Sequence, residues 1–166
     1  MSQFTSPVPL PAPDAVAPEI YLEIYPMPMF VIVPTRELEV SKDFWIRGLG
    51  FADLFTMPGQ VVHLRRWAFQ DVLLVPAEQA TEAPGMSVSF SCVVSQIDEI
   101  AARCEELAPG STSEPRVMPW NSLELVVTTP ENTRVVMTAA RPLDPASPEA
   151  DNIRAMGIEV PEGAQH

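Results

Sequence analysis

Side chains that could carry out chemistry are few in this chain, and histidine is the scarcest of them. The 166 residues contain two histidines, His63 and His166. His63 lies in the run VVHLRRWAFQ, whose apolar and aromatic residues predict a strand. A histidine there could act as a general base if a partner orients it and its pKa lies near neutrality, although an isolated strand histidine is more often structural.

The two cysteines predict packing rather than reactivity. The apolar positions of one amphipathic segment are Ile97, Ile100, Cys104 and Leu107, which recur at helical spacing. Apolar surroundings raise a thiol pKa, so we expect Cys104, and Cys92 on a neighbouring strand, to be inert. Two cysteines are too few for a disulfide framework, which indicates a reduced cytoplasmic location.

An internal repeat predicts the elements that would position these groups. Residues 29–76 follow the order strand, helix, strands, and residues 86–140 repeat it. We therefore expect an α+β fold in which two paired β-α-β-β-β modules form a curved mixed sheet around a groove. The expected divisions are a proline-rich arm with a possible extra strand (1–28), two modules (29–80 and 86–140) and a C-terminal extension with a short helix (141–166).

Local patterns refine this division. The first helix is expected at about 38–48, with Ser41, Phe44 and Trp45 on one stripe. EIYLEIY (19–25) has period two and predicts the extra strand. Ser147 before Pro148 predicts a helix over 148–156 that ends at Gly157 and buries Ile153 and Met156.

Charge excludes some classes of partner. Ten Lys and Arg against 22 Asp and Glu give a formal net charge of −12. Such a chain repels phosphate backbones, so nucleic acid and anionic membrane surfaces are not expected partners. No apolar run reaches the roughly 18–20 residues that a membrane span needs, and the first residues do not read as a secretory signal.

Three short motifs in a fixed order carry a resemblance to a known family. Residues 37–45 (ELEVSKDFW) resemble the "D-L-x-x-S-x-x-F-Y" helix entry of the vicinal oxygen chelate superfamily. Residues 48–51 (GLGF) resemble its "LGF" turn, and residues 129–133 (TPENT) its "D-P-D-G-N" turn before the last strand. The resemblance covers about residues 29–140. It implies the glyoxalase and bleomycin-resistance fold and, for enzymes of the family, a divalent metal in the groove.

The metal positions implied by the resemblance hold unsuitable side chains. Counting from the motifs places them at Phe30, Leu73, Ser89 and Val136. Divalent cations need nitrogen, oxygen or thiolate ligands, usually three or more protein groups, and these side chains do not supply them. We therefore expect no metal and no other cofactor.

Strand alternation predicts what lines the groove instead. Leu123, Leu125 and Val127 should face the helices. The residues expected to face a ligand are Phe30, His63, Arg65, Trp67, Phe69, Trp120, Glu124, Arg134 and Val136. Aromatic planes beside scattered polar groups suit a planar ligand held by stacking and cation–π contact. The alternatives are that the aromatic residues belong to the core and that Glu124 and Arg134 pair with each other.

The resulting hypothesis is a non-catalytic binding protein of the bleomycin-resistance type that sequesters a small, largely planar natural product such as an antibiotic. The acidic charge would favour a cationic ligand. An alternative is a metal-independent lyase or isomerase that uses His63 or Glu124 as acid–base catalyst. A third is a structural or regulatory subunit whose groove holds a protein segment such as the arm. We also expect a homodimer, because the resemblance implies grooves built from two chains and an open strand edge invites a partner.

Overall fold

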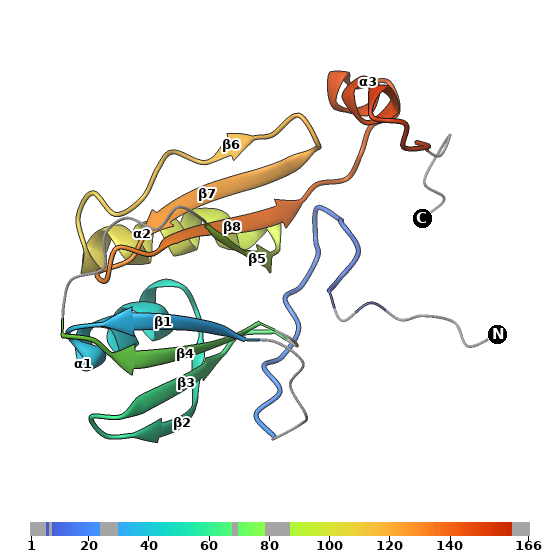
Figure 1. The fold of residues 1–166 in the computed structure, drawn as a ribbon. Coiled ribbons are helices and arrows are strands. Elements are labelled where there is room, and N and C mark those ends of the chain that lie inside the picture. The colour runs from blue at the N-terminus through green and yellow to red at the C-terminus, as the bar shows by residue number, and fades with distance from the viewer. Residues whose placement is uncertain (1–5, 7, 24–29, 68–69, 79–86, 161–166) are drawn as a thin grey trace.

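The computed structural model describes residues 6, 8–23, 30–67, 70–78 and 87–160 (Figure 1). Two successive groups of elements, here module 1 and module 2, share the order strand, helix, three strands. Module 1 contains β1 (Val31–Thr35), α1 (Leu38–Asp43), the π-helical η1 (Phe44–Gly48), β2 (Ala52–Met57), β3 (Val61–Arg65) and β4 (Asp71–Pro76). Module 2 contains β5 (Val88–Cys92), the 3-10 turn η2 (Val94–Gln96), α2 (Ile97–Leu107), β6 (Arg116–Val117), β7 (Ser122–Thr128) and β8 (Arg134–Ala140). Helix α3 (Pro148–Ala155) follows.

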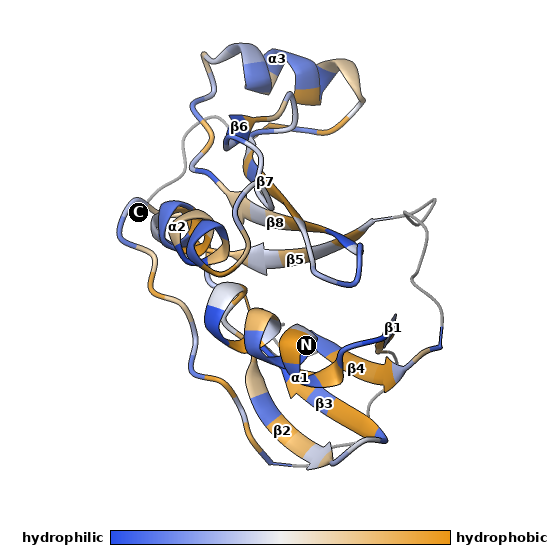
Figure 2. Cartoon of the chain, turned by 90° about the vertical axis from the view of Figure 1, so that its left-hand side faces the viewer, coloured by the Kyte–Doolittle hydropathy of each residue, from blue (hydrophilic) through white to orange (hydrophobic). Residues whose placement is uncertain are grey.

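Each module forms its own four-stranded mixed sheet. The strand orders are β1-β4-β3-β2 and β5-β8-β7-β6, with β1–β4 and β5–β8 parallel and the other pairs antiparallel. In Figure 1 the sheets lie one beside the other, with β2 and β6 at the two outer edges. Figure 2 shows α1 and α2 on the same side of both sheets, which leaves the opposite face of each sheet without a helix. The predicted α+β fold is confirmed.

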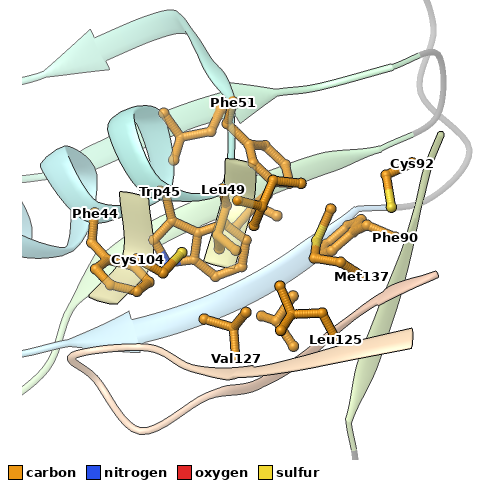
Figure 3. Packing of buried hydrophobic residues seen from close by; sticks show 14 of the residues in the cluster. Phe44, Trp45, Leu49, Phe51, Phe90, Cys92, Cys104, Leu125, Val127 and Met137 are labelled. Atoms are coloured by element: carbon orange, nitrogen blue, oxygen red, sulfur yellow. The ribbon is translucent and has the colours of Figure 1, made fainter. Parts of the chain in front are cut away.

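One apolar core joins the two modules beneath the helices (Figure 3). Trp45, Phe51 and Phe90 pack edge to face, with ring centroids 5.1–6.1 Å apart. Such pairs favour this geometry because the positive ring edge meets the negative ring face. At Gly48 an added Cβ would lie 3.0 Å from Sγ of Cys104, so glycine allows η1 to approach α2 closely.

The helices agree with their sequence signals. The predicted helix over 38–48 is present as α1 followed by η1, and Ser41, Phe44 and Trp45 are buried. In α3 the Ser147 side chain accepts a hydrogen bond from the Ala150 N–H, with Pro148 in the first turn, as expected for an N-cap.

Two local predictions are wrong. Residues 19–23 do not form a strand, and the rest of the predicted strand, 24–25, lies outside the described residues. Met156, just after α3, is exposed and Ile153 within it is only half-buried, because Ala150 is the position that packs inward. In the described part of the chain no helix is long and apolar enough to cross a membrane.

The arm lies against the body of the protein. Residues 8–23 run along one end of both sheets, on the right of Figure 1. A cavity of about 90 Å³ is lined by the arm between Val8 and Ala15 and by the ends of β5 and β8. The arm therefore contacts module 2 first and then reaches the end of β3 in module 1, where Arg65 holds it.

Candidate functional site

The face of each sheet that lacks a helix, here the open face, follows from strand alternation. In sheet 1 the side chains of Val33, Val62 and Leu74 are buried toward the helices. The ladder aligns their neighbours in one row across the sheet, in the order Ile32, Leu73, His63 and Phe55. Ile32 is 59% and Phe55 53% exposed, so this row presents apolar surface around one histidine.

Sheet 2 obeys the same rule. Leu125 and Val127 are fully buried toward the helices, as predicted, and Leu123 is half-buried. Val135 and Met137 on β8 are fully buried on the same side. The alternate residues form the open face, where the ladder sets Val136 between Ser89 and Val126. Val136 faces this side as predicted but is buried. Oγ of Ser89 lies 2.6 Å from Oγ1 of Thr138, so hydroxyl groups satisfy one another here.

Ladder register identifies the matched strand positions of the two modules. Val31 pairs with Val72 in β1–β4, and Val88 pairs with Val135 in β5–β8. The module 1 counterpart of Ser89 is therefore Ile32, and the assignment of Phe30 was wrong by two residues. Phe30 precedes β1 and is exposed.

The four matched positions are Ile32, Leu73, Ser89 and Val136, as two laterally paired residues in each sheet. These side chains do not fit a divalent cation, because they offer one hydroxyl oxygen and no imidazole or carboxylate. Among the described residues no group of three or more His, Cys, Asp or Glu side chains lies close enough to hold a metal ion.

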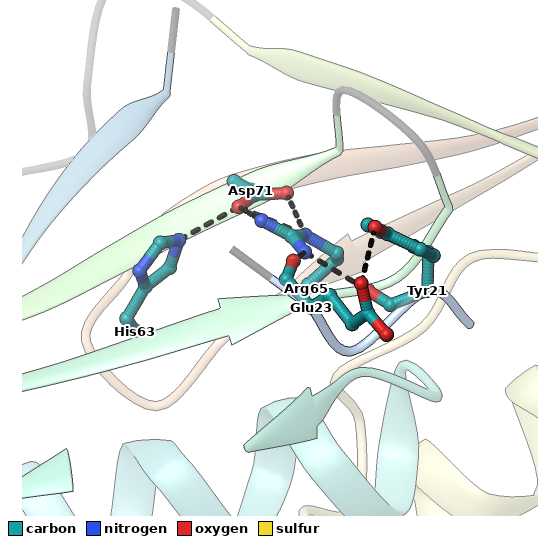
Figure 4. Close-up of polar contacts among 5 residues, drawn as sticks. All are labelled: Tyr21, Glu23, His63, Arg65 and Asp71. Atoms are coloured by element: carbon teal, nitrogen blue, oxygen red, sulfur yellow. Dashed lines mark hydrogen bonds and ion pairs between the residues drawn. The ribbon is translucent and has the colours of Figure 1, made fainter. Parts of the chain in front are cut away.

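His63 has a charged partner (Figure 4). Its Nε2 lies 2.7 Å from Oδ2 of Asp71, and the imidazole is 24% exposed whereas the carboxylate is fully buried. Asp71 also accepts hydrogen bonds from Nε and Nη2 of Arg65, at 2.9 Å each. The carboxylate thus orients the imidazole toward the open face and compensates the buried guanidinium.

Arg65 is not the open groove side chain that alternation predicted. It is 1% exposed, and its Nη1 donates to the backbone carbonyls of Tyr21 and Glu23, at 2.9 and 2.8 Å. The hydroxyl of Tyr21 in turn donates to the Glu23 carboxylate. Arg65 therefore anchors the arm to the end of sheet 1.

Trp67 and Phe69 do not extend the row of β3. The strand ends at Arg65, so alternation stops there. Trp67 is 2% exposed, and the Arg66 guanidinium lies 4.7 Å from its ring centroid. The prediction of Trp67 as an open aromatic plane is wrong, since the ring is buried in the turn after β3. Phe69 lies outside the described residues.

Trp120 and Glu124 do lie together on sheet 2. Nε1 of Trp120 and Oγ of Ser122 both donate to Oε1 of Glu124, at 3.0 and 2.8 Å. Trp120 is 51% exposed, so its ring is available at the surface. Glu124 pairs across the ladder with Thr138, whereas the exposed Arg134 sits at the far end of β8 opposite Thr128. The alternative of a Glu124–Arg134 pair is therefore wrong.

Sequence reasoning missed Asp71 and Phe55. Asp71 alternates with Leu73 along β4, so period two could have placed it beside Arg65 and His63. Phe55 was hidden by an irregularity in the ladder between Asp53 and Phe55, which shifts the alternation of β2.

The cysteines have the predicted structural role. Cys92 and Cys104 are buried and unpaired. Burial raises the pKa of each thiol to about 12, which leaves almost no thiolate at neutral pH.

Solved structures share this fold. The fosfomycin resistance protein FosX from Listeria monocytogenes matches with TM-score 0.58 and 10% identity over 70% of this chain and 95% of that one. The bleomycin resistance determinant encoded on transposon Tn5 matches with TM-score 0.51 and 16% identity, covering 68% and 96%. A glyoxalase/bleomycin resistance protein/dioxygenase from Nocardioides matches with TM-score 0.52 and 20% identity, covering 72% and 86%. No protein-family model and no curated protein matches the sequence.

These likenesses show the fold. Together with the two β-α-β-β-β modules, they establish that the chain has the vicinal oxygen chelate fold that the sequence motifs predicted.

Proposed function

We propose that the open faces of the two sheets bind a small organic molecule without a metal ion and without altering it chemically. The observation that carries this proposal is the character of the four matched strand positions. Ile32, Leu73, Ser89 and Val136 supply three apolar side chains and one hydroxyl where the enzymes of this fold class place metal ligands. Ile32 and Ser89 are exposed, Leu73 is half-buried and Val136 is buried. Apolar side chains left exposed on a sheet are a common mark of an interaction site.

The shape of the ligand follows from the aromatic side chains at the surface. Phe30, Phe55 and Trp120 are all exposed. Aromatic faces gain from offset or edge contacts with other rings, which favours a largely planar ligand. Trp67 no longer contributes, so the stacking partners differ from those that the sequence suggested.

Charge and likeness narrow the class of ligand. A net charge of −12 raises the local concentration of cations, which favours a positively charged molecule. Several proteins that share the fold are named for resistance to bleomycin or fosfomycin. A natural product such as an antibiotic is therefore the class that we propose, in a cytoplasmic protein.

A homodimer would complete this site. Sheet 1 exposes Ile32, Phe55 and Met57 on one face, which a second chain could cover to convert an open face into a groove. Light scattering at micromolar concentration should give twice the 18.2 kDa of one chain. A mass of a single chain would reject the dimer.

Intrinsic fluorescence tests the binding proposal, because Trp120 is the exposed indole while Trp45 and Trp67 are buried. Bleomycin and other planar, cationic natural products should include a compound that quenches the emission saturably. The quenching should be lost in Trp120→Phe, because this variant lacks the exposed indole that reports binding. Calorimetry should show that the variant still binds the compound. A panel without any saturable binder would count against the proposal.

The His63–Asp71 contact favours a second candidate, a metal-independent lyase or isomerase. A carboxylate 2.7 Å from an imidazole fixes the ring orientation, which acid–base catalysis requires. This candidate predicts product formation that His63→Ala abolishes and that Glu124→Gln tests separately. An unchanged ligand recovered after prolonged incubation would favour binding alone.

A further inference from the structure

Two adjacent arginines are buried, and only one of them has a carboxylate as counter-charge. Arg65 is 1% and Arg66 2% exposed. Arg65 is compensated by the buried carboxylate of Asp71, whereas no carboxylate of the described residues lies within ion-pair distance of Arg66. A buried charge without a counter-charge is costly, so this difference calls for an explanation.

The groups that accept hydrogen bonds from the Arg66 guanidinium are neutral. Nη1 donates to the carbonyl of Ser91, and Nη2 donates to Oε1 of Gln96 at 2.9 Å. The guanidinium also lies over the Trp67 ring. These contacts hold Arg66 between module 1 and module 2, yet burial still lowers the pKa of this guanidinium to about 10, with a further contribution from the charge of Arg103.

The guanidinium of Arg103 lies near that of Arg66, beside Gly50. A Cβ placed on Gly50 would meet Nη2 of Arg103 at 3.8 Å and Nε of Arg66 at 3.9 Å, and nothing else within 4 Å. Neither of these nitrogens has a hydrogen-bond partner among the described residues. Among the described residues, every side-chain nitrogen or oxygen that is inaccessible to solvent has a hydrogen-bond partner. Because Nε of Arg66 has no such partner, this atom must still be in contact with solvent.

We propose that Arg66 and Arg103 form a binding site for a small oxyanion, a phosphate or carboxylate group, over Gly50. Two guanidinium groups that converge from different modules suit such a group, because its oxygens accept charge-assisted hydrogen bonds from both. A side chain at position 50 would contact both guanidinium groups, whereas Gly50 leaves that volume unfilled, and its φ of +78° is a conformation that glycine adopts without strain.

Binding there would tie the modules together. Arg103 belongs to α2 of module 2, while Arg66 and Gly50 belong to module 1. A bound oxyanion would compensate the buried charge and bridge the junction, so it should stabilise the folded chain. The site lies on the helix side of the molecule, apart from the open faces, and does not depend on the function proposed for them.

Inorganic phosphate and acetate are suitable probes, compared with sodium chloride at equal ionic strength. Either oxyanion should raise the melting temperature of the protein more than chloride does, and calorimetry should give a Kd. Arg103→Gln should weaken that Kd on the order of ten-fold, since it removes one charged donor. Arg66→Lys, which keeps the charge but loses the guanidinium Nε, should weaken it as well.

Arg154→Gln is the matched control. Arg154 is 42% exposed and paired with Asp151 on a helix, while Arg103 is 40% exposed and paired with Glu99. The control should leave the Kd of the oxyanion unchanged. The proposal is overturned if neither oxyanion exceeds the effect of chloride, or if Arg103→Gln and Arg154→Gln bind the oxyanion equally well.

Discussion

The turns that precede the last strand of each module share one backbone hydrogen bond and differ in the charge of the side chain that they present. Residues 66–70 connect β3 to β4, and residues 129–133 connect β7 to β8. In each turn the first N–H donates to the last carbonyl at 3.0 Å, from Arg66 to Gln70 and from Thr129 to Thr133. A side chain of each turn also forms hydrogen bonds with the other module, Arg66 with module 2 and Glu131 with module 1. These two contacts are here called the clasps of module 1 and module 2.

The clasp of module 2 is the carboxylate of Glu131, and each of its two oxygens accepts a hydrogen bond. Oε1 of Glu131 accepts from Nε1 of Trp45 and Oε2 accepts from Oγ of Ser41, both at 2.7 Å. Oγ of Ser41 in turn lies 2.7 Å from Oγ1 of Thr35. The clasp of module 1 is the cation of Arg66, bound to neutral acceptors alone. In both modules this turn contacts the other module, through the carboxylate of Glu131 from module 2 and through the guanidinium of Arg66 from module 1.

The open faces differ in the same manner. Asp71 and Arg134 occupy matched ladder positions, opposite Arg65 and Thr128. Asp71 is buried in a network with Arg65 and His63, whereas Arg134 is exposed. Module 1 therefore depends on internal charge compensation at a place where module 2 does not.

Asp71→Ala should give the largest effect in this comparison. It leaves the Arg65 guanidinium buried without a counter-charge, which should lower the free energy of unfolding by about 3–5 kcal/mol. The matched change Arg134→Ala, on an exposed residue, should stay within about 0.5 kcal/mol. Urea denaturation of both variants measures the difference, and equal losses would contradict the distinction between the modules.

Glu131→Ala should come next. It leaves the buried Trp45 N–H and Ser41 hydroxyl without their acceptor, at a cost of about 2–3 kcal/mol. Glu124→Ala is a matched control, because Glu124 also accepts from a tryptophan and a serine but on the open face. We expect a loss of less than about 1 kcal/mol there by the same measurement. A larger loss for Glu124 than for Glu131 would refute the clasp.

Alkaline pH should lower the free energy of unfolding, because two thiols are buried in the core that the modules share. Burial raises the pKa of Cys92 and Cys104 above their unfolded values, to about 12. A raised folded pKa stabilises the fold fully below the unfolded pKa, and this stability is lost as pH rises from about 9 toward 12. Between pH 9 and 10 the loss should be about 1 kcal/mol for each thiol, and Cys104→Ala should remove its share. A pH-independent free energy of unfolding in that interval would contradict the burial of the thiols.

Trp120→Ala should have the smallest effect on stability and a specific one on binding. The exposed indole should contribute on the order of 0.5–1.5 kcal/mol to the affinity of a stacked ligand, with a change in unfolding free energy within about 0.5 kcal/mol. Calorimetry and urea denaturation of this variant separate the two quantities. Unchanged affinity would exclude Trp120 from the site.

The sequence was sufficient for the fold because the signals are local and repeated. Helical spacing of Ile97, Ile100 and Cys104, and alternation in β7 and β8, reflect burial that each element shows on its own. The site was harder to predict because it depends on where the alternation ends. Trp67 lies beyond the last ladder pair of β3, and the arm that binds Arg65 comes from a part of the chain more than 40 residues away.

Metal-free ligand binding is best measured by calorimetric titration of planar, cationic natural products, bleomycin among them, into the protein in the presence of EDTA. We expect at least one compound to bind saturably, with a Kd that EDTA leaves unchanged and that added Mn²⁺ or Zn²⁺ does not improve. Binding that requires the added metal, or tight stoichiometric binding of the metal itself, would contradict it.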